Sequence, residues 1–256
     1  MFAIERLNKI KELLYKNKRV DVFELSEQFS VTEATIRRDL DKLAQQGFLV
    51  KIYGGAVLKE DFEQNPLLID QDDKLAKEKK MIGKIASQMI EDGEAVFIGA
   101  GTTCLEIARH IKNKRVTVVT NDILVAYELK NCAGIKVLVT GGDLLRSSTA
   151  LVGGFALRAL EGIYISKAFI GVKGIHIDSG FTVNSHEEAQ LAQSIIEISR
   201  ETVVAADYTK FDQIGFARLG ALTIAQKVIS NKKVPDRYKT YFFEQAIKLF
   251  TAYELE

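Results

Sequence analysis

Apolar residues recur at intervals of three and four along the first fifty residues, which is the spacing of amphipathic helices. The first series predicts a helix over about Ala3–Tyr15. A second helix is expected after Asp21 and a third after Thr32, because both residues favour the N-cap position. Gly47 follows the third series and suits the left-handed residue that ends many helices. The pattern therefore predicts three short helices, the last two joined by a tight turn.

Beyond Gly47 the pattern changes to short strands. Phe48–Ile52 and Ala56–Leu58 are typical of strands, and the Gly54-Gly55 pair between them is a hairpin signal. Three helices followed by a hairpin predict a winged helix-turn-helix domain over residues 1–58. Residues 59–73 are polar and acidic and contain a proline, which predicts a linker.

The remainder, residues 74–256, alternates amphipathic segments with short continuous apolar runs. We expect strands at Ala95–Ile98, Val116–Thr120, Ile135–Thr140, Ala168–Gly171, Val203–Asp207 and Lys227–Ser230. We expect helices at Lys74–Ile90, Thr103–Ile111, Ile123–Lys130 and His186–Ser199. Continuous apolar strands separated by helices predict a mostly parallel sheet that is covered on both faces. The predicted fold class is therefore α/β, with a winged helix-turn-helix domain before the sheet domain.

Composition places the chain among ordinary globular proteins, with 47% hydrophobic and 27% charged residues in 256. Two cysteines provide no disulfide framework and favour a reducing compartment. The sequence shows neither a signal peptide nor an apolar run long enough to cross a bilayer, so we expect a cytoplasmic protein without a membrane partner. Residues 1–59 carry 11 Lys and Arg against 8 Asp and Glu, a small basic excess.

The third predicted helix has an apolar stripe of Ile36, Leu40 and Leu43 and an opposite polar face. A helix of this kind, held by a partner helix, fits the major groove of DNA. Adjacent arginines point about 100° apart on a helix, so one can reach a base edge while the other holds a phosphate. The predicted DNA-binding residues are Thr32, Thr35, Arg37, Arg38 and Lys42, with Lys51 and Tyr53 on the wing. The alternative is a small helical bundle whose arginines are merely solvated.

A second signal is the turn Gly99-Ala100-Gly101-Thr102-Thr103, which follows a predicted strand and opens a helix. Glycines let the backbone approach an anion, and N–H groups and hydroxyls at a helix N-terminus bind phosphate. The turn partly matches the dinucleotide fingerprint, but Cys104 stands at the last glycine position. The two threonines favour a small phosphate ester over a dinucleotide. A purely structural turn is the remaining alternative.

Further polar residues and glycines follow other predicted strands, where ligands gather in open α/β sheets. These are Asn121, Gly141, Gly142 and Lys210, to which the Gly180-Phe181-Thr182 segment and Glu188 are added. Lys210 could neutralise a phosphate or be a solvated loop residue. Glu188 could face sugar hydroxyls or only favour the dipole of its helix. The three histidines, His110, His176 and His186, lack metal-ligand spacing, so no metal site and no catalytic residue is predicted.

These residues resemble the DeoR-type bacterial transcriptional regulators over nearly the whole chain. Thr35-Ile36-Arg37-Arg38-Asp39-Leu40 followed by Gly54-Gly55-Ala56 is the most specific signature. Matching segments in the rest of the chain are Gly101–Thr103, Val119–Asn121, Gly141–Gly142, Phe169–Gly171, Gly180–Thr182, Glu188–Ala189 and Asp207–Phe211. The resemblance implies a sensor domain related in fold to ribose-5-phosphate isomerase and glucosamine-phosphate deaminase.

The resemblance further implies that a phosphorylated sugar binds at the strand ends. Gly101, Thr102 and Thr103 would hold the phosphate with help from Lys210, while Asn121, Glu188 and Thr182 would face the sugar. The chain departs from the family at three positions. Gly99 stands where some members have Asp, Asp212 where many have Gly, and Tyr53 where many have His.

The function implied is that of a repressor of a sugar-uptake or catabolism operon, acting as a homodimer or homotetramer on double-stranded operator DNA. No resident cofactor is expected, and a phosphorylated sugar is the effector. Release of the operator is the usual response in the family. The sequence itself does not show whether the effector releases the operator or promotes its binding. One alternative is a sugar-phosphate isomerase that uses Glu188 with Lys173 or Lys210. A second alternative is a repressor that senses NAD(H) at the Gly99–Cys104 turn.

Overall fold

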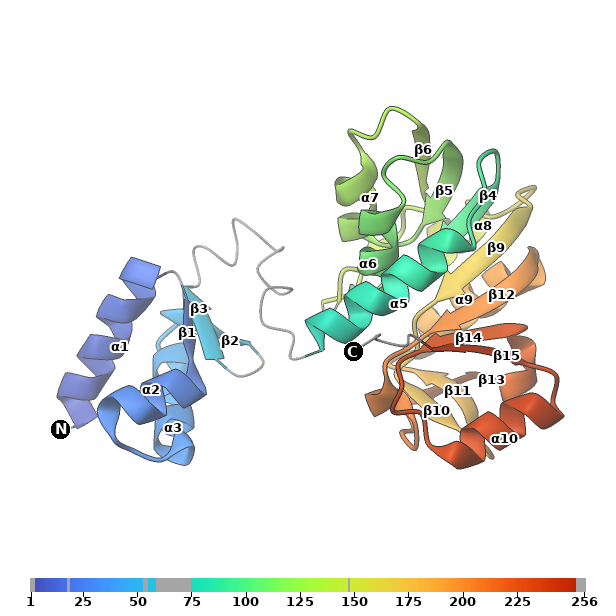
Figure 1. The fold of residues 1–256 in the computed structure, drawn as a ribbon. Helices are drawn as coiled ribbons and strands as arrows, with labels where there is room; N and C mark the ends of the chain where they lie inside the picture. Colours follow the sequence, from blue (N-terminus) through green and yellow to red (C-terminus); the bar gives the residue numbers. More distant parts are fainter. Residues whose placement is uncertain (1–2, 18, 53–54, 59–74, 147, 252–256) are drawn as a thin grey trace. The chain divides into compact units, whose positions relative to one another are not determined.

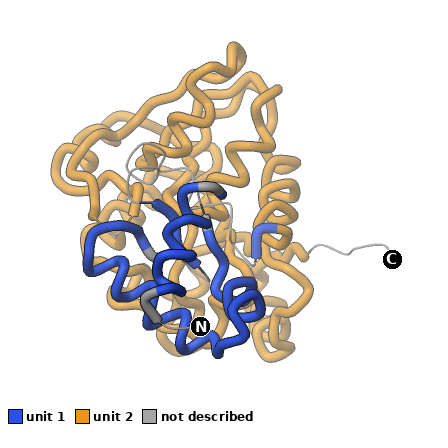
Figure 2. Tube along the Cα trace, turned by 90° about the vertical axis from the view of Figure 1, so that its left-hand side faces the viewer, with its two compact units in different colours: residues 1–76 blue, residues 77–256 orange. Residues whose placement is uncertain are grey.

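The computed structural model describes residues 3–17, 19–52, 55–58, 75–146 and 148–251 (Figure 1). The chain divides into two compact units, Met1–Ala76 and Lys77–Glu256 (Figure 2). We call them the DNA-binding unit and the sensor unit, after the roles expected of them from the sequence. The predicted linker, residues 59–73, lies outside the described residues. In the described part, no helix has both the length and the apolar character needed to cross a membrane.

The three helices of the DNA-binding unit are α1 (Ala3–Asn17), α2 (Val22–Phe29) and α3 (Glu33–Gln45). Both predicted N-caps are confirmed. The Asp21 carboxylate accepts the N–H groups of Phe23 and Glu24 at 2.7 and 3.2 Å. The Thr32 hydroxyl accepts the N–H of Thr35 at 3.3 Å. Gly47 has a φ of +72° just after α3, as expected for the residue that ends a helix.

The predicted hairpin is part of a three-stranded antiparallel sheet with the order β1-β3-β2. Its strands are β1 (Arg19–Asp21), β2 (Leu49–Ile52) and β3 (Gly55–Leu58). Strand β1 was not predicted, because three residues are too few to show an alternation. It lies so close to β3 that a Cβ on Gly55 would be 2.0 Å from the carbonyl oxygen of Val20. Gly55 therefore serves strand packing, while Gly54 lies outside the described residues.

A buried ion pair joins α1 to α3. Arg6 Nε lies 2.5 Å from Asp39 Oδ2, and the two side chains are 9% and 3% exposed. Around the pair, the apolar stripes of the three helices form one core with the strands; its members include Ile10, Leu14, Leu25, Ile36, Leu40 and Leu43. The Arg6–Asp39 pair fixes the first helix to the candidate DNA-reading helix from inside this core.

The sensor unit is built on a parallel sheet with the order β15-β14-β12-β9-β4-β5-β6. The strands are β4 (Ala95–Ile98), β5 (Val116–Thr120), β6 (Ile135–Val139), β9 (Ile165–Ile170), β12 (Ser199–Ala205), β14 (Lys227–Ser230) and β15 (Lys248–Thr251). The six predicted strands all belong to this sheet. The predicted α/β class with a mostly parallel sheet is confirmed.

Residues on successive positions of a strand enter different cores, as the strand period of two requires. Val96 and Ile98 belong to the core under α5 (Ala76–Gln88), α6 (Thr102–His110) and α7 (Ile123–Leu129). Phe97, between them, belongs to the core on the other face. That core includes residues of α8 (Gly154–Arg158), α9 (His186–Glu197) and α10 (Asp236–Glu244). Both faces of the sheet are therefore covered (Figure 1).

Two smaller β-structures complete the sensor unit. An antiparallel sheet of β10 (Gly174–His176), β11 (Gly180–Val183) and β13 (Ala217–Gly220) packs into the same core as α9. A short pair, β7 (Asp143–Leu144) and β8 (Leu151–Val152), follows β6, and the 3₁₀ turns η2 (Tyr208–Lys210) and η3 (Leu222–Ile224) follow β12 and β13.

Asp212 explains one departure from the family pattern. Its φ is +59°, a conformation that favours glycine, and its carboxylate accepts a hydrogen bond from Tyr238 Oη at 2.6 Å and pairs with Arg237. The Tyr238 hydroxyl and then the Arg237 guanidinium hold the pKa of Asp212 below its usual value. The same carboxylate thus compensates for the backbone conformation that a glycine would adopt freely.

Acid should therefore weaken the sensor unit through Asp212. Because the folded-state pKa is lowered, the stabilisation is present above the unfolded pKa of about 3.9 and is lost as the pH falls through the folded value. We expect the difference in melting temperature between wild type and Asp212→Asn to shrink between pH 5 and pH 3. Thermal melts over this range, with exposed Glu161→Gln as control, measure it. A difference that stays constant with pH would contradict the role of the carboxylate.

Candidate functional site

The polar face predicted for DNA is present on α3. Arg37, Arg38 and Lys42 are exposed there, while Ile36 and Leu40 are buried. Arg37 forms an exposed ion pair with Glu33 at 2.9 Å, which is screened by water and is easily exchanged for a phosphate contact. Within the described residues of α3, Arg38 pairs with no carboxylate of its own helix.

The remaining predicted DNA contacts lie at the start of α3 or on the wing, and part of the wing is outside the described residues. Thr32 is exposed at the start of α3, and the Thr32 and Thr35 hydroxyl oxygens are 3.0 Å apart. At this distance the two hydroxyls form a hydrogen bond with each other at the N-terminus of α3. Lys51 lies on β2, but its side chain and the whole of Tyr53 are outside the described residues.

The sensor unit has a cavity of about 260 Å³ at the carboxyl ends of β4 and β9. The chain order runs outward from β4 through β5 to β6 on one side, and outward from β9 through β12 on the other. The boundary between β4 and β9 is therefore the point where the strand order reverses, and ligands of open α/β sheets bind at such points. Of the predicted effector residues, the cavity is lined by Gly99, Gly101, Thr102, Thr103, Asn121, Glu188 and Lys210.

The glycine turn is shaped for close approach. Gly101 has a φ of +110° and is the N-cap residue of α6, and no side chain caps that helix. The first N–H groups of α6 after Gly101 are therefore without a side-chain partner and can serve an anion. The N–H of Gly101 itself differs from our expectation, because it donates to Asp122 Oδ2 at 3.2 Å. Asp122 thus holds the turn in place rather than leaving every N–H to a ligand.

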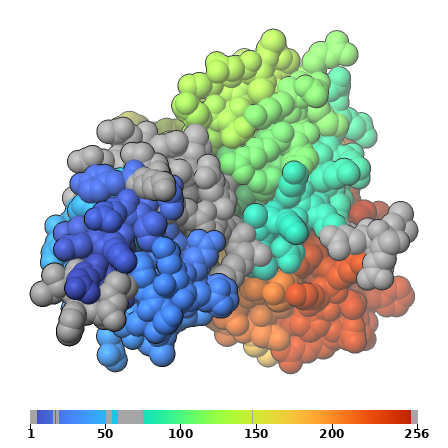
Figure 3. Space-filling view, turned by 60° about the vertical axis from the view of Figure 1, so that its left-hand side comes forward, coloured from blue at the N-terminus to red at the C-terminus, as the bar shows by residue number. Residues whose placement is uncertain are grey.

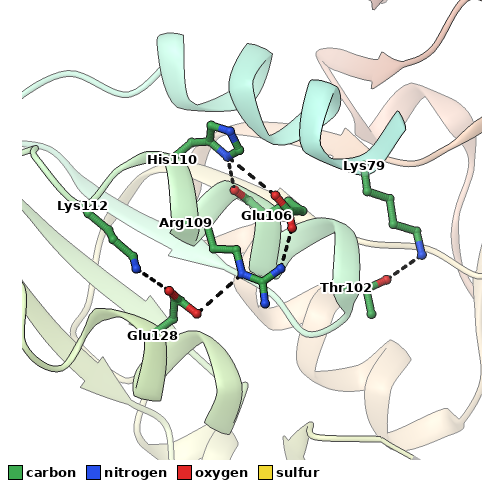
Figure 4. Close-up of polar contacts among 7 residues, drawn as sticks. All are labelled: Lys79, Thr102, Glu106, Arg109, His110, Lys112 and Glu128. Atoms are coloured by element: carbon green, nitrogen blue, oxygen red, sulfur yellow. Dashed lines mark hydrogen bonds and ion pairs between the residues drawn. The ribbon is translucent and has the colours of Figure 1, made fainter. Parts of the chain in front are cut away.

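Three lysines line the cavity, Lys79, Lys173 and Lys210, against the single carboxylate of Glu188. Lys79 Nζ donates to Thr102 Oγ1 at 2.7 Å (Figure 4). Lys210 Nζ is 3.8 Å from Asp207 Oδ2, a buried atom for which no hydrogen-bond partner is found. The excess of positive charge complements a phosphate dianion. Sequence reasoning missed Lys79, because nothing in its helical spacing shows that α5 approaches the Gly99–Thr103 turn.

Asn121 and Glu188 have structural contacts within the cavity wall. Asn121 Nδ2 donates to the carbonyl of Leu151 at 3.2 Å. Glu188 Oε2 accepts the N–H groups of Asn184 and Ser185 at 3.0 and 3.2 Å, and the Ser185 hydroxyl accepts the N–H of Glu188, which is a capping box. The alternative in which Glu188 stabilises its helix is therefore observed, although the side chain also borders the cavity.

Three predicted effector residues do not line the cavity. Gly141 and Gly142 follow β6 with positive φ values, and a Cβ on Gly142 would be 2.3 Å from the carbonyl oxygen of Val152. Thr182 is 2% exposed, and its hydroxyl accepts the N–H of Gly215 at 2.7 Å and donates to the carbonyl of Gly174 at 3.3 Å. The close backbone approach at Gly142 and the two hydrogen bonds of the Thr182 hydroxyl are structural contacts.

The other candidate chemistry has structural explanations. Burial raises the pKa of the Cys104 thiol to about 12, so this cysteine is not a thiolate at neutral pH. His110 Nδ1 lies 2.7 Å from the carbonyl oxygen of Glu106, beside ion pairs of Arg109 with Glu106 and Glu128 (Figure 4). His176 Nδ1 accepts N–H groups of the β10–β11 turn. Among the described residues, no group of His, Cys, Asp and Glu has the arrangement of a metal site.

Comparison with known proteins assigns the two units of the chain to two known types of domain. A family model described as a DeoR-like helix-turn-helix domain matches residues 6–62, and one described as a DeoR C-terminal sensor domain matches residues 74–232. The uncharacterised helix-turn-helix transcriptional regulator YulB of Bacillus subtilis is 33% identical over 90% of both chains. The glycerol-3-phosphate regulon repressor of Escherichia coli is 28% identical over 92% of this chain and 93% of its own.

Among solved structures, ribose 5-phosphate isomerase A from Methanocaldococcus jannaschii aligns with 54% of this chain and 55% of its own. The sequence identity is 16% and the TM-score is 0.40.

Proposed function

The chain belongs to the DeoR family of helix-turn-helix transcriptional regulators, and on this basis we propose that it represses a sugar-uptake or catabolism operon under control of a phosphorylated sugar. The observation that carries the proposal is the cavity at the β4–β9 boundary, with the N-terminus of α6 and three lysines on its wall. A small dianion is the ligand that this charge and these N–H groups fit best. The protein would act in the cytoplasm, where both DNA and phosphorylated sugars occur.

Control of DNA binding would depend on the pairing of DNA-binding units in a homodimer or homotetramer. Two helix-turn-helix units read half-sites about 34–36 Å apart, or a multiple, so a small reorientation prevents both from docking. One relative is named the glycerol-3-phosphate regulon repressor. Its name connects a repressor similar to this chain with a phosphorylated small molecule, which supports an effector of this class. Binding of the effector here would release the operator.

The alternatives are less well supported. The family consists of transcriptional regulators, and the carboxylate of Glu188, which an isomerase would need as a base, is held by two backbone N–H groups. For an NAD(H) sensor, a cavity of about 260 Å³ is small, because pockets for drug-sized ligands span roughly 300–1,000 Å³.

A thermal-shift screen tests the effector class. The panel contains ribose 5-phosphate, glucose 6-phosphate, fructose 1-phosphate, fructose 6-phosphate and glycerol 3-phosphate, each beside its unphosphorylated partner, and NADH. At a hundred times Kd a ligand adds about 2.7 kcal/mol to stability, which raises the melting temperature by several degrees. We expect at least one phosphorylated compound to do so and its unphosphorylated partner to fail. Stabilisation by NADH alone, or steady turnover of a sugar phosphate, would contradict the proposal.

Arg38 tests the DNA face. Replacing Arg38 by alanine should weaken operator binding by about 1–3 kcal/mol if it reads a base, or reduce the salt dependence by about one phosphate contact if it holds the backbone. Lys9, exposed on α1, provides a matched control as Lys9→Ala. Fluorescence anisotropy with an operator fragment at several salt concentrations measures both quantities. Wild-type affinity in Arg38→Ala would remove this residue from the interface.

A further inference from the structure

Lys79 connects the cavity to the helix that follows the linker. It lies near the start of α5, the first described helix of the sensor unit, and its side chain lines the cavity. Its ammonium group donates to Thr102 Oγ1 at 2.7 Å, so it lies beside the first residue of α6 (Figure 4). No other residue of α5 is part of the cavity wall as described.

A second contact fixes the same two helices one turn further along. A Cβ on Gly83 would lie 2.7 Å from the carbonyl carbon and the carbonyl oxygen of Glu106, so the backbones of α5 and α6 touch there. Gly83 follows Lys79 by one helical turn, and Glu106 follows Thr102 by one turn. The two contacts therefore hold α5 against α6 in one register, with the Lys79 end beside the cavity.

The Thr102 hydroxyl can join Lys79 to an anion. A hydroxyl both accepts and donates hydrogen bonds, and here the oxygen already accepts from Lys79. Its own hydrogen can then point to an anion at the N-terminus of α6, where the first-turn N–H groups and the nearby ammonium charge also favour negative charge. We propose that Lys79 binds the anionic group of the effector together with α6, and thereby makes the position of α5 depend on occupancy of the cavity.

This contact can act on DNA binding because residues 59–73 connect α5 to the wing in the sequence. A ligand shifts a conformational equilibrium only when it contacts the two arrangements differently. The contact between Lys79 and the anion forms only while α5 lies against α6, so the effector favours that arrangement of α5 over any other. The inference rests on the proposed function, since it takes the effector to be a phosphorylated sugar.

The outer face of α5 offers a matched control. Lys80 and Lys84 are exposed, whereas Lys79 is half-buried, and the space-filling view shows residues of this segment on the surface of the sensor unit (Figure 3). Lys80→Met removes the same charge from the same helix without touching the cavity wall. Lys79→Met, Lys79→Gln and Lys79→Arg then separate the loss of charge from the loss of side-chain length.

The experiment uses the full-length protein and two readouts. Calorimetry measures the Kd of inorganic phosphate and of the panel compound that binds wild type most tightly. We expect Lys79→Met and Lys79→Gln to weaken both about tenfold to a hundredfold, the effect of losing one charge-assisted hydrogen bond. Lys79→Arg and Lys80→Met should stay within about threefold of wild type, and the unphosphorylated sugar should show no binding to wild type or to any variant.

The second readout is the ratio of operator affinities with and without the sugar phosphate, at concentrations that saturate each variant. In Lys79→Met this ratio should move toward one, although the cavity is full. Wild-type sugar-phosphate affinity in Lys79→Met, or a full operator response once it is saturated, would overturn the inference while the proposed function stands. Absence of sugar-phosphate binding in wild type would instead overturn both.

Discussion

Asp39→Ala should unfold the DNA-binding unit and leave the sensor unit folded. In the wild type, Arg6 Nε lies 2.5 Å from the Asp39 carboxylate. The substitution removes this carboxylate and leaves the Arg6 guanidinium buried without a partner for its charge. Removing one member of a buried pair costs about 3–5 kcal/mol. A domain of some sixty residues has a total stability of roughly this size, at about 0.05–0.15 kcal/mol per residue. The loss is therefore comparable with the whole stability of the unit.

Amide hydrogen exchange read by mass spectrometry separates the two units. Peptides from residues 3–52 should lose protection in Asp39→Ala, while peptides from residues 77–251 keep it. Glu27→Ala, an exposed acid on α2, should change neither. The double substitution Arg6→Met with Asp39→Leu should restore much of the protection, because an apolar pair removes both charges from the core. Full protection in Asp39→Ala would show that the pair contributes little.

The second large effect is expected at the Gly99–Thr103 turn of the cavity, where we propose that the phosphate binds. Valine has nearly the shape of threonine, so Thr102→Val with Thr103→Val removes two hydroxyls from the cavity wall and keeps the helix. Each hydrogen bond to a charged group contributes about 1.5–3 kcal/mol, so sugar-phosphate affinity should fall at least about a hundredfold. Operator binding without effector should be unchanged.

Calorimetry with the compound identified by the thermal-shift screen measures this loss. Thr117→Val on β5, a strand residue that does not line the cavity, is the matched control and should bind normally. If the double valine variant binds the sugar phosphate as wild type does, the phosphate lies elsewhere, and the three lysines of the cavity would have to be reassigned.

Elements of the fold that depend on neighbouring residues alone could be predicted from the sequence. Asp21 and Thr32 are caps because a short side chain next to an apolar helix can reach the free N–H groups. The buried strands β4, β5 and β14 are short segments rich in β-branched and other apolar residues, and the predicted bounds coincide with those observed. Such features are determined by residues a few positions apart, so they can be predicted from the sequence alone.

Features that depend on distant partners were missed. Strand β1 exists because it pairs with β3, and β15 because it pairs with β14. The small sheet of β10, β11 and β13 is made of runs of three or four residues, which pair across more than thirty positions at β11 and β13. Arg6 and Asp39 look like ordinary surface charges until α1 packs on α3. Lys79 enters the cavity only because α5 crosses the start of α6.

The same distinction divides the candidate site. Residues of the Gly99–Thr103 turn could be predicted, because a glycine turn between strand and helix places them at the sheet edge. Thr182 was expected to face the sugar, but its hydroxyl is engaged by Gly215, far along the chain, which the sequence alone does not show. The cavity therefore combines a glycine turn that the sequence predicts with walls that only tertiary packing defines.

The most direct test of the account is the operator affinity of the wild-type protein with and without a sugar phosphate. Fluorescence anisotropy should show tight operator binding that weakens steeply with salt. Saturation with the phosphorylated compound should lower this affinity about 5- to 150-fold, the usual range of coupling between two sites, while the unphosphorylated sugar has no effect. An operator affinity that is the same in the presence of every phosphorylated compound, although one of them binds the cavity, would contradict the central claim.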